Sequence, residues 1–182
     1  MTDETKGEGR FPEAFGRDAI TRLVQELFTG WRDRIHVNGS PSPPLDAVRL
    51  VQRFWEAYLT ADDATARAAL ADDVRIEFVI RPGAEPDRAG DGPDGALARL
   101  DAHFSALTVV ATSIGSVDVS DDTVAFRGRE RGVVRATGRA YDVAFSHRYT
   151  LASDRIATLT IGLLSDGDAD SFARACDTDG PS

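Results

Sequence analysis

The chain has 182 residues, 42% of them hydrophobic, and a formal net charge of −9. This acidic balance argues against nucleic acid or an anionic membrane as the main partner, and the length suits one domain with extensions. The single cysteine, Cys176, excludes an intrachain disulfide, and no stretch approaches the roughly 20 apolar residues of a membrane span. The first residues also lack the apolar run of a secretory signal, so we expect a cytoplasmic protein.

Residues 1–44 are expected to form an N-terminal extension to the main domain. Residues 17–35 carry apolar side chains at helical spacing, which predicts an amphipathic helix that packs on the same domain or on a partner subunit. Residues 39–44 contain three prolines and predict a stiff linker.

Residues 45–165 are expected to form the main domain. Its first half predicts helices at 45–61 and 64–70, a strand at 74–80, a long loop at 82–95 and a helix at 95–107. Asp62 and Asp63 stand where a cap of the second helix is expected.

The second half of the domain predicts four consecutive strands joined by short turns. The expected strands are 109–119, 123–136, 139–152 and 155–164. Residues 166–182 are acidic and polar, which predicts a flexible tail. Because helices come first and antiparallel strands last, the order indicates an α+β fold, with a strongly curved antiparallel sheet wrapped around the helices.

The strand at 139–152 carries the clearest candidate for a site. One of its faces presents the residues Tyr141, Val143, Phe145, His147, Tyr149 and Leu151. An apolar face interrupted by one histidine and two tyrosines is either part of the core or the wall of a pocket.

Glu130 and His147 are the candidate catalytic pair. If Thr137 and Gly138 form a two-residue hairpin turn, Glu130 and His147 become diagonal neighbours on one face, within side-chain reach. Such a pair suits general acid–base catalysis, and Tyr141, Tyr149 or Tyr58 would stabilise an oxyanion. The alternative is a satisfied polar contact inside a barrel, or a Glu130 that lies near an open rim.

Other candidate positions have both a functional and a structural interpretation. His103 either lines the mouth of a pocket or occupies an exposed helix position, and the exposed position is favoured. Asp101 and Glu77 are expected on the surface. The expected ligand-pocket residues are Trp55, Tyr58, Phe78, His103, Phe126, Tyr141, Phe145 and Tyr149. For Trp55 and Tyr58 the alternative is a place in the core, with the Tyr58 hydroxyl reaching the cavity.

Four arginines are expected on the outer face of the sheet: Arg127, Arg129, Arg131 and Arg148. With the two-residue turn, Arg127 faces Arg148, an unfavourable pair unless Asp118, Asp142 or the acidic tail supplies counter-charges. This face is either a dimer interface or a solvated charged surface.

Several segments together resemble the SnoaL-like members of the nuclear-transport-factor-2-like superfamily. These segments are residues 51–58 (VQRFWEAY), 71–78 (ADDVRIEF), 95–100 (GALARL), 138–143 (GRAYDV) and 154–156 (DRI). The resemblance spans about residues 45–164. It implies a cone-shaped α+β barrel with an apolar pocket and, in many members, a homodimer.

The family includes polyketide cyclases, ketosteroid isomerases, epoxide hydrolases, dehydratases and binding modules without activity. Members of the aldol-cyclase type carry a histidine and an aspartate near the start of the last strand, whereas residues 156–164 contain neither. The cyclase mechanism therefore does not transfer directly.

The residues favour an enzyme that uses no metal and no cofactor. The chain shows no zinc-ligand spacing and no phosphate-binding glycine loop in the right context. We expect cyclase, isomerase, dehydratase or epoxide-hydrolase chemistry on a small apolar, polyketide- or terpenoid-like metabolite. The alternative is a non-catalytic module for ligand binding or dimerisation.

Overall fold

The computed structural model describes residues 35–37, 45–89, 92–120 and 122–178, and the statements below concern these residues. The linker expected at 39–44 and all but the last residue of the helix expected at 17–35 lie outside them. That last residue, Ile35, belongs to strand β1 (Ile35–Val37).

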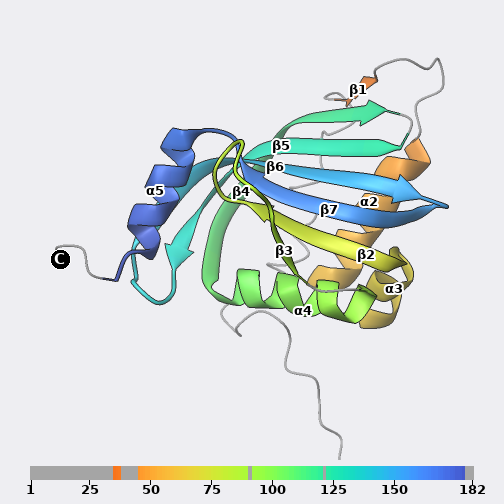
Figure 1. Ribbon diagram of the computed structural model, residues 1–182, viewed down its shortest axis with the longest axis horizontal. Helices are drawn as coiled ribbons and strands as arrows, with labels where there is room; N and C mark the ends of the chain where they lie inside the picture. Colours follow the sequence, from red (N-terminus) through yellow and green to blue (C-terminus); the bar gives the residue numbers. More distant parts are fainter. Residues whose placement is uncertain (1–34, 38–44, 90–91, 121, 179–182) are drawn as a thin grey trace, which may run out of the picture.

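A seven-stranded sheet in the order β1-β4-β5-β6-β7-β2-β3 forms the body of the described structure (Figure 1). The remaining strands are β2 (Leu70–Val79), β3 (Asp87–Ala89), β4 (Leu107–Ser120), β5 (Thr123–Val134), β6 (Ala140–Ala152) and β7 (Arg155–Leu163). Strands β4 to β7 form the expected antiparallel meander. Two parallel pairings extend it, β2 with β7 and β1 with β4. With three residues each, β1 and β3 are too short to show an alternating pattern in the sequence.

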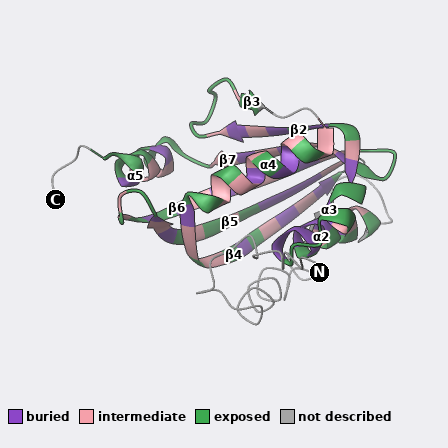
Figure 2. Cartoon of the chain, turned by 90° about the horizontal axis from the view of Figure 1, so that it is seen from below, coloured by how far each residue is buried: buried purple, intermediate pink, exposed green. Residues whose placement is uncertain are grey.

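The helices of the first half gather on one side of the sheet. Helices α2 (Leu45–Leu59) and α4 (Gly92–Ser105) lie along it, with the short α3 (Asp63–Ala68) beside them (Figure 2). The Asp62 carboxylate caps α3 by accepting the Thr65 N–H at 3.1 Å, as expected. Strand β2 begins at Leu70, earlier than expected, and is irregular where it pairs with β7 between Leu70 and Arg75.

Two clusters of buried side chains form the core. The large core cluster joins α2, α4 and the sheet, and its fully buried members include Phe54, Tyr58, Leu100, Tyr149 and Leu159. The small core cluster consists of Leu107, Val134, Tyr141, Val143 and Ala175, with Leu163 and Phe172 packed against it.

The expectation of a loose tail is wrong for residues 166–176, which form helix α5 (Asp166–Cys176). The Ser165 side chain caps this helix by accepting the Asp168 N–H at 3.1 Å. Its apolar positions are mostly alanines, so the helical period is weak in the sequence. The helix is held in place by its burial of Ala175 and Phe172 against the small core cluster.

The hairpin between β5 and β6 differs from the expected two-residue turn. Val134 pairs with Arg139 across four turn residues, and the Gly138 N–H donates to the Val134 carbonyl at 2.8 Å. The Thr137 hydroxyl donates to the Ala175 carbonyl of α5 at 2.6 Å, a tertiary contact that a turn propensity does not contain. The pairing is therefore shifted by two residues, which preserves the faces of both strands but changes every partner.

Two glycines of β5 allow aromatic rings of β6 to lie across the sheet. Gly128 pairs with Phe145 and Gly132 with Tyr141. A Cβ atom at Gly132 would lie 2.6 Å from the Tyr141 hydroxyl and 2.5 Å from the Thr108 carbonyl, so no side chain fits there. Strand β4 has irregularities opposite the same stretch, and bulges and glycines at such positions let a sheet bend.

Candidate active site

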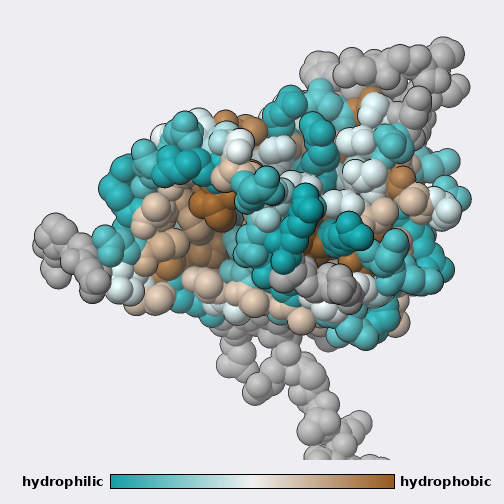
Figure 3. Space-filling view, in the orientation of Figure 1, coloured by the Kyte–Doolittle hydropathy of each residue, from teal (hydrophilic) through white to brown (hydrophobic). Residues whose placement is uncertain are grey.

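A cavity lies between the large and the small core clusters. Its empty space, including the part that opens to solvent, is about 490 Å³. In Figure 3, hydrophobic side chains gather in a hollow beside α5. The lining residues are Phe78, Ile80, His103, Phe104, Leu107, Glu130, Tyr141, Val143, Phe145, His147, Ile161, Gly162, Leu163 and Phe172. Four of these carry polar groups: His103, Glu130, Tyr141 and His147.

Glu130 and Tyr141 form one polar group of the cavity, called the glutamate end below. The Tyr141 hydroxyl donates to Glu130 Oε1 at 2.8 Å. Burial raises the pKa of Glu130, and hydrogen bonds from Tyr141 and Thr112 oppose that rise. Burial and the nearby Glu130 charge raise the pKa of Tyr141, so its hydroxyl keeps its proton. The rings of Phe172 and Tyr141 pack in a T-shaped arrangement with 5.4 Å between their centroids, so α5 helps to build this end.

His147 and His103 form the second polar group, called the histidine end below. The His147 ring stacks on Trp55 with 5.6 Å between centroids and contacts Phe145 at 4.7 Å. Its Nδ1 lies 3.4 Å from the Tyr149 hydroxyl, which also accepts a hydrogen bond from Trp55 Nε1. Burial, and to a smaller extent the nearby His103, lowers the pKa of His147 to about 3. The ring is therefore neutral at physiological pH.

His103 lies in the cavity wall, so the expectation of an exposed helix position is wrong. Helix α4 covers the sheet, and the His103 ring contacts Phe78 at 4.5 Å and Phe104 at 5.0 Å between centroids. Burial, followed by the positive charge of Arg99, lowers the pKa of His103 to about 4. The histidine end thus presents two neutral imidazoles to the cavity.

The expected diagonal contact between Glu130 and His147 is wrong. The observed register places Val143 opposite Glu130 and Phe126 opposite His147. The two side chains share a face and line the same cavity, but they are separated by about four residues of strand, roughly 13 Å along the sheet. The two side chains therefore do not reach each other and do not form the expected pair.

The expected pocket residues divide between cavity and core. Phe78, Tyr141 and Phe145 line the cavity along with His103. The other four belong to the large core cluster and do not line this cavity: Trp55, Tyr58, Phe126 and Tyr149. The Tyr58 hydroxyl donates to the half-buried Asp101 at 2.9 Å, and neither residue lines this cavity.

Lining residues from β7 and α5 were not expected from the sequence. Ile161 and Leu163 lie in the expected last strand, for which no site residue was predicted. Phe172 lies in the segment that was expected to be a flexible tail. The signal for Phe172 was the serine cap at Ser165 followed by apolar residues at helical spacing.

The four arginines expected on the outer face of the sheet are exposed, and ion pairs are formed by Arg127 and Arg129. Arg127 lies opposite Ser146, not Arg148, and its guanidinium contacts Asp118 at 2.8 Å. Arg129 contacts Asp142 at 2.7 Å. The expected counter-charges are thus supplied by Asp118 and Asp142.

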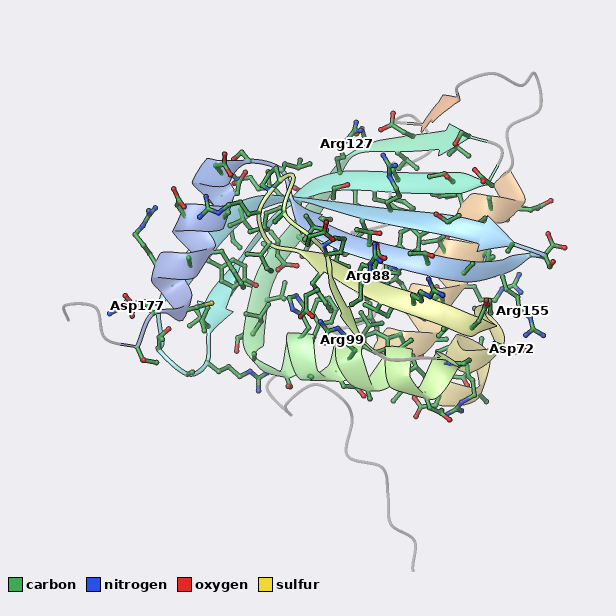
Figure 4. All side chains as sticks on the ribbon, viewed as in Figure 1. Asp72, Arg88, Arg99, Arg127, Arg155 and Asp177 are labelled. Carbon is green, nitrogen blue, oxygen red and sulfur yellow. The ribbon has the colours of Figure 1, made fainter. Side chains whose placement is uncertain are left out.

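Further ion pairs join β2 and β3 to each other and to their neighbours α4 and β7. Arg88, Arg99, Arg155 and Asp72 are labelled in Figure 4. Arg88 contacts Glu77 at 3.1 Å, and Glu77 is half-buried, not exposed as expected. Arg155 contacts Asp72 at 2.9 Å, and Arg99 on α4 pairs with Asp87.

Within the described ranges, no group of three His, Cys, Asp or Glu side chains is arranged to hold a metal ion. None of the helices in this part of the chain is long and apolar enough to cross a membrane.

Comparisons with solved structures and with a protein-family model agree on the fold. A search of curated proteins finds no match to the chain. Among solved structures, a protein from Jannaschia sp. CCS1 assigned as a SnoaL-like polyketide cyclase superposes with a TM-score of 0.60 at 19% identity, over 79% of this chain and 99% of that one. A nuclear-transport-factor-2-like protein from Burkholderia xenovorans LB400 gives 0.57 at 21%, over 76% and 100%. An epoxide hydrolase from M. tuberculosis, named for its likeness to the LEH enzyme, gives 0.52 at 17%, over 72% and 92%.

At these identities the likeness to solved structures establishes the fold only. The family model for the SnoaL-like domain matches residues 51–159, more than half of the chain. The match covers the segments on which the resemblance was first seen, and the curved sheet and its helices have the architecture of the superfamily. The chain belongs to the SnoaL-like family of the nuclear-transport-factor-2-like superfamily.

Proposed function

We propose that this protein is an enzyme that carries out acid–base chemistry, with its own side chains, on a small and largely apolar molecule bound in the cavity. The observation that supports this most is the composition of the cavity wall. It is apolar except for two neutral imidazoles at one end and, at the other, a carboxyl of raised pKa with the Tyr141 hydroxyl bonded to it. A cleft that holds titratable groups with shifted pKa values is a candidate site for proton transfer.

The reaction class we propose is cyclisation, isomerisation, dehydration or epoxide opening. Each needs a proton moved to or from carbon or oxygen, and residues of this kind supply such transfers. Solved structures with the same fold include one assigned as a polyketide cyclase and one epoxide hydrolase, which supports the class without selecting a member. The apolar lining favours a polyketide- or terpenoid-like skeleton over a sugar or a phosphate ester.

Glu130 and His147 would act from opposite ends of the bound molecule. Burial favours the neutral form of Glu130, while the Tyr141 hydroxyl supports its carboxylate, so this side chain suits both proton donation and acceptance. Tyr141 would keep Glu130 in one orientation. His147 would contact the other end of the ligand from its place between Trp55 and Phe145.

A non-catalytic binding module is the second candidate. Strand β7 carries neither the histidine nor the aspartate of the cyclase-type members, and Glu130 already has hydrogen bonds from Tyr141 and Thr112. A site with its acid satisfied and its last strand apolar could hold a ligand without converting it.

The test begins with identification of a small molecule that copurifies with the protein, by mass spectrometry of a denatured extract. Turnover of that molecule is then measured for the wild type, Glu130→Gln and His147→Ala, with the exposed Glu85→Gln as the matched control. We expect turnover to fall at least about a hundredfold in the first two variants and to stay unchanged in the control. Full turnover in both site variants would refute the assignment of Glu130 and His147 as the acid–base residues, and binding without turnover in the wild type would support the binding module.

We also propose that two copies of the chain associate through the outer face of the sheet. Arg127 and Arg129 are exposed there beside Asp118 and Asp142, an arrangement that also suits exchange of ion pairs between subunits. Light scattering in low and high salt tests this. A monomer mass under both conditions would show that the face is only a solvated surface.

A further inference from the structure

His147 is connected to two residues behind the cavity wall, Trp55 and Tyr149. Tyr149 is fully buried and Trp55 nearly so. An indole N–H can only donate, so the contact between Trp55 Nε1 and the Tyr149 hydroxyl has one possible direction, with the tyrosine oxygen as acceptor. The hydroxyl hydrogen of Tyr149 is then left to find an acceptor of its own.

His147 Nδ1, at 3.4 Å, is the acceptor within reach. In the part of the chain that the structure describes, no other group accepts from the Tyr149 hydroxyl. Burial raises the pKa of Tyr149, so the hydrogen stays on its oxygen. If Nδ1 carried a hydrogen instead, the buried hydroxyl would have no acceptor, which is costly in a protein interior.

We infer that Trp55 and Tyr149 are positioning residues that hold neutral His147 as the tautomer protonated at Nε2. His147 therefore donates a hydrogen bond into the cavity, and the molecule bound there offers a neutral acceptor oxygen, such as a carbonyl, ether or epoxide oxygen, to Nε2. The proton-accepting role then falls to Glu130. The tautomer follows from the core contacts alone, while the role of the donor rests on the proposed function.

The accessibility of Nε2 agrees with this role. No described residue hydrogen-bonds Nε2. In the described ranges, the one side-chain polar atom that is both inaccessible and without a hydrogen-bond partner is Arg99 Nε, so Nε2 is accessible. Nε2 therefore keeps contact with the cavity that His147 lines. We call the two hydrogen bonds from Trp55 to Tyr149 and from Tyr149 to Nδ1 the relay. Because the relay occupies Nδ1 on the core side, Nε2–H is the ring donor that remains for the cavity.

His103 provides an internal comparison. It lines the same cavity and is also neutral at physiological pH, but neither of its ring nitrogens has a hydrogen-bond partner among the described residues. Nothing in its surroundings selects one tautomer. We therefore expect His103 to populate both forms under the conditions in which His147 populates one.

Nitrogen-15 NMR of the full chain tests the inference without any substrate. Long-range proton–nitrogen spectra near pH 7 distinguish the two tautomers of each histidine. We expect His147 to be protonated at Nε2 in an excess of roughly tenfold or more, and His103 to be mixed. A His147 that is protonated at Nδ1, or as mixed as His103, overturns the inference.

Two variants test whether Tyr149 and Trp55 fix the tautomer of His147. Tyr149→Phe removes the hydroxyl that donates to Nδ1, and Trp55→Phe removes the N–H that orients it, so both should lower the Nε2–H excess several-fold. Tyr58→Phe, which removes a hydroxyl from the same core cluster that bonds Asp101, is the matched control and should leave His147 unchanged. An unchanged tautomer in a folded Tyr149→Phe protein contradicts the positioning role. If that variant does not fold, the wild-type spectrum still decides.

The outcome is separable from that of the proposed function. A protein without turnover can still show the Nε2–H tautomer, which supports the relay and places His147 as the donor of a binding site. A catalytic protein whose His147 is protonated at Nδ1 keeps the proposed function and loses this inference.

Discussion

The two ends of the cavity are built by different means. At the histidine end, His147 is held between aromatic rings and contacts the Tyr149 hydroxyl, and both Trp55 and Tyr149 belong to the large core cluster. At the glutamate end, Glu130 and Tyr141 depend on the small core cluster and on α5, whose Phe172 is half-buried. Each end is therefore only as rigid as the cluster behind it.

This difference suggests a division of labour. A group that must present one tautomer in one direction benefits from a close-packed environment, since packed interiors hold side chains in single rotamers. The glutamate end lies beside α5, in which Ala169 and Ala175 are the buried residues, and elements that bury little open at lower free energy than a central core. Under the proposed function, the glutamate end is the part of the site that opens more easily, and the histidine end is the part that orients the ligand.

The largest expected effect compares two leucines of the same strand. Leu159 is fully buried in the large core cluster, whereas Leu163 borders the cavity. Leu159→Ala should lower the free energy of unfolding by about 2–5 kcal/mol. Leu163→Ala should cost less than half as much, because space beside that side chain is already empty. Urea unfolding measures both, and equal losses would remove the distinction between the clusters.

The second prediction uses pH, because the two ends respond to it in opposite directions. The pKa values of His147 and His103 are lowered to about 3 and about 4, so the unfolded chain binds protons at a higher pH than the folded one. Their contribution to stability is complete above pH 6.5 and is lost as the pH falls, by up to about 1.4 kcal/mol per pH unit for each histidine.

Glu130 has the opposite sign, since its raised pKa makes its contribution fall as the pH rises above 4.5. Unfolding curves collected between about pH 4 and pH 7 should therefore flatten in His147→Phe and steepen in Glu130→Gln. The same slope in all three proteins would show that these groups titrate alike in the folded and unfolded states.

The third prediction concerns Gly132, which leaves room for the Tyr141 hydroxyl. A methyl group there would collide with that hydroxyl and with the Thr108 carbonyl, so Gly132→Ala should cost about 1–3 kcal/mol. It should also raise the pKa of Glu130 further, because the Tyr141 hydrogen bond now lowers it. Gly115→Ala is the control, since its nearest contact would be 3.6 Å away. A Glu130 pKa unchanged in Gly132→Ala, followed by carbon-13 NMR, would argue against the contact.

The smallest effect is expected from Phe172→Ala in α5. The loss of a half-buried ring and its contact with Tyr141 should cost about 1–2 kcal/mol and speed hydrogen exchange in α5 but not in α4. Arg174→Ala, an exposed change in the same helix, serves as the control. Faster exchange in both helices would mean that the two clusters unfold as one unit.

Element types and most boundaries were predictable because they follow from local periodicity. Helix α2 and the meander strands β5 to β7 lie within two residues of their expected ends, and the Asp62 cap is present. The helix α5 was missed, although Ser165 and the spacing of Ala169, Phe172 and Ala175 were visible, because alanines give a weak apolar signal.

The composition of one sheet face was also a property of the sequence. A period of two residues placed Glu130, Tyr141, Phe145 and His147 on the same side, and a shift of the pairing by two residues leaves that placement intact. The partners were not predictable. In the hairpin turn the Thr137 hydroxyl donates to the Ala175 carbonyl. The register set by this turn separates Glu130 from His147 and places it beside Tyr141.

The sequence by itself determined the α+β class, the family and the residues that share the cavity face, because these depend on short-range periodicity and on motifs. The tertiary structure decided which of them meet. Helix α4 brought His103 inward, α5 completed the glutamate end, and Trp55 and Tyr149 came together behind His147 from positions 94 residues apart. Such contacts arise from the packing of segments that are distant in the sequence, and no local sequence pattern predicts them.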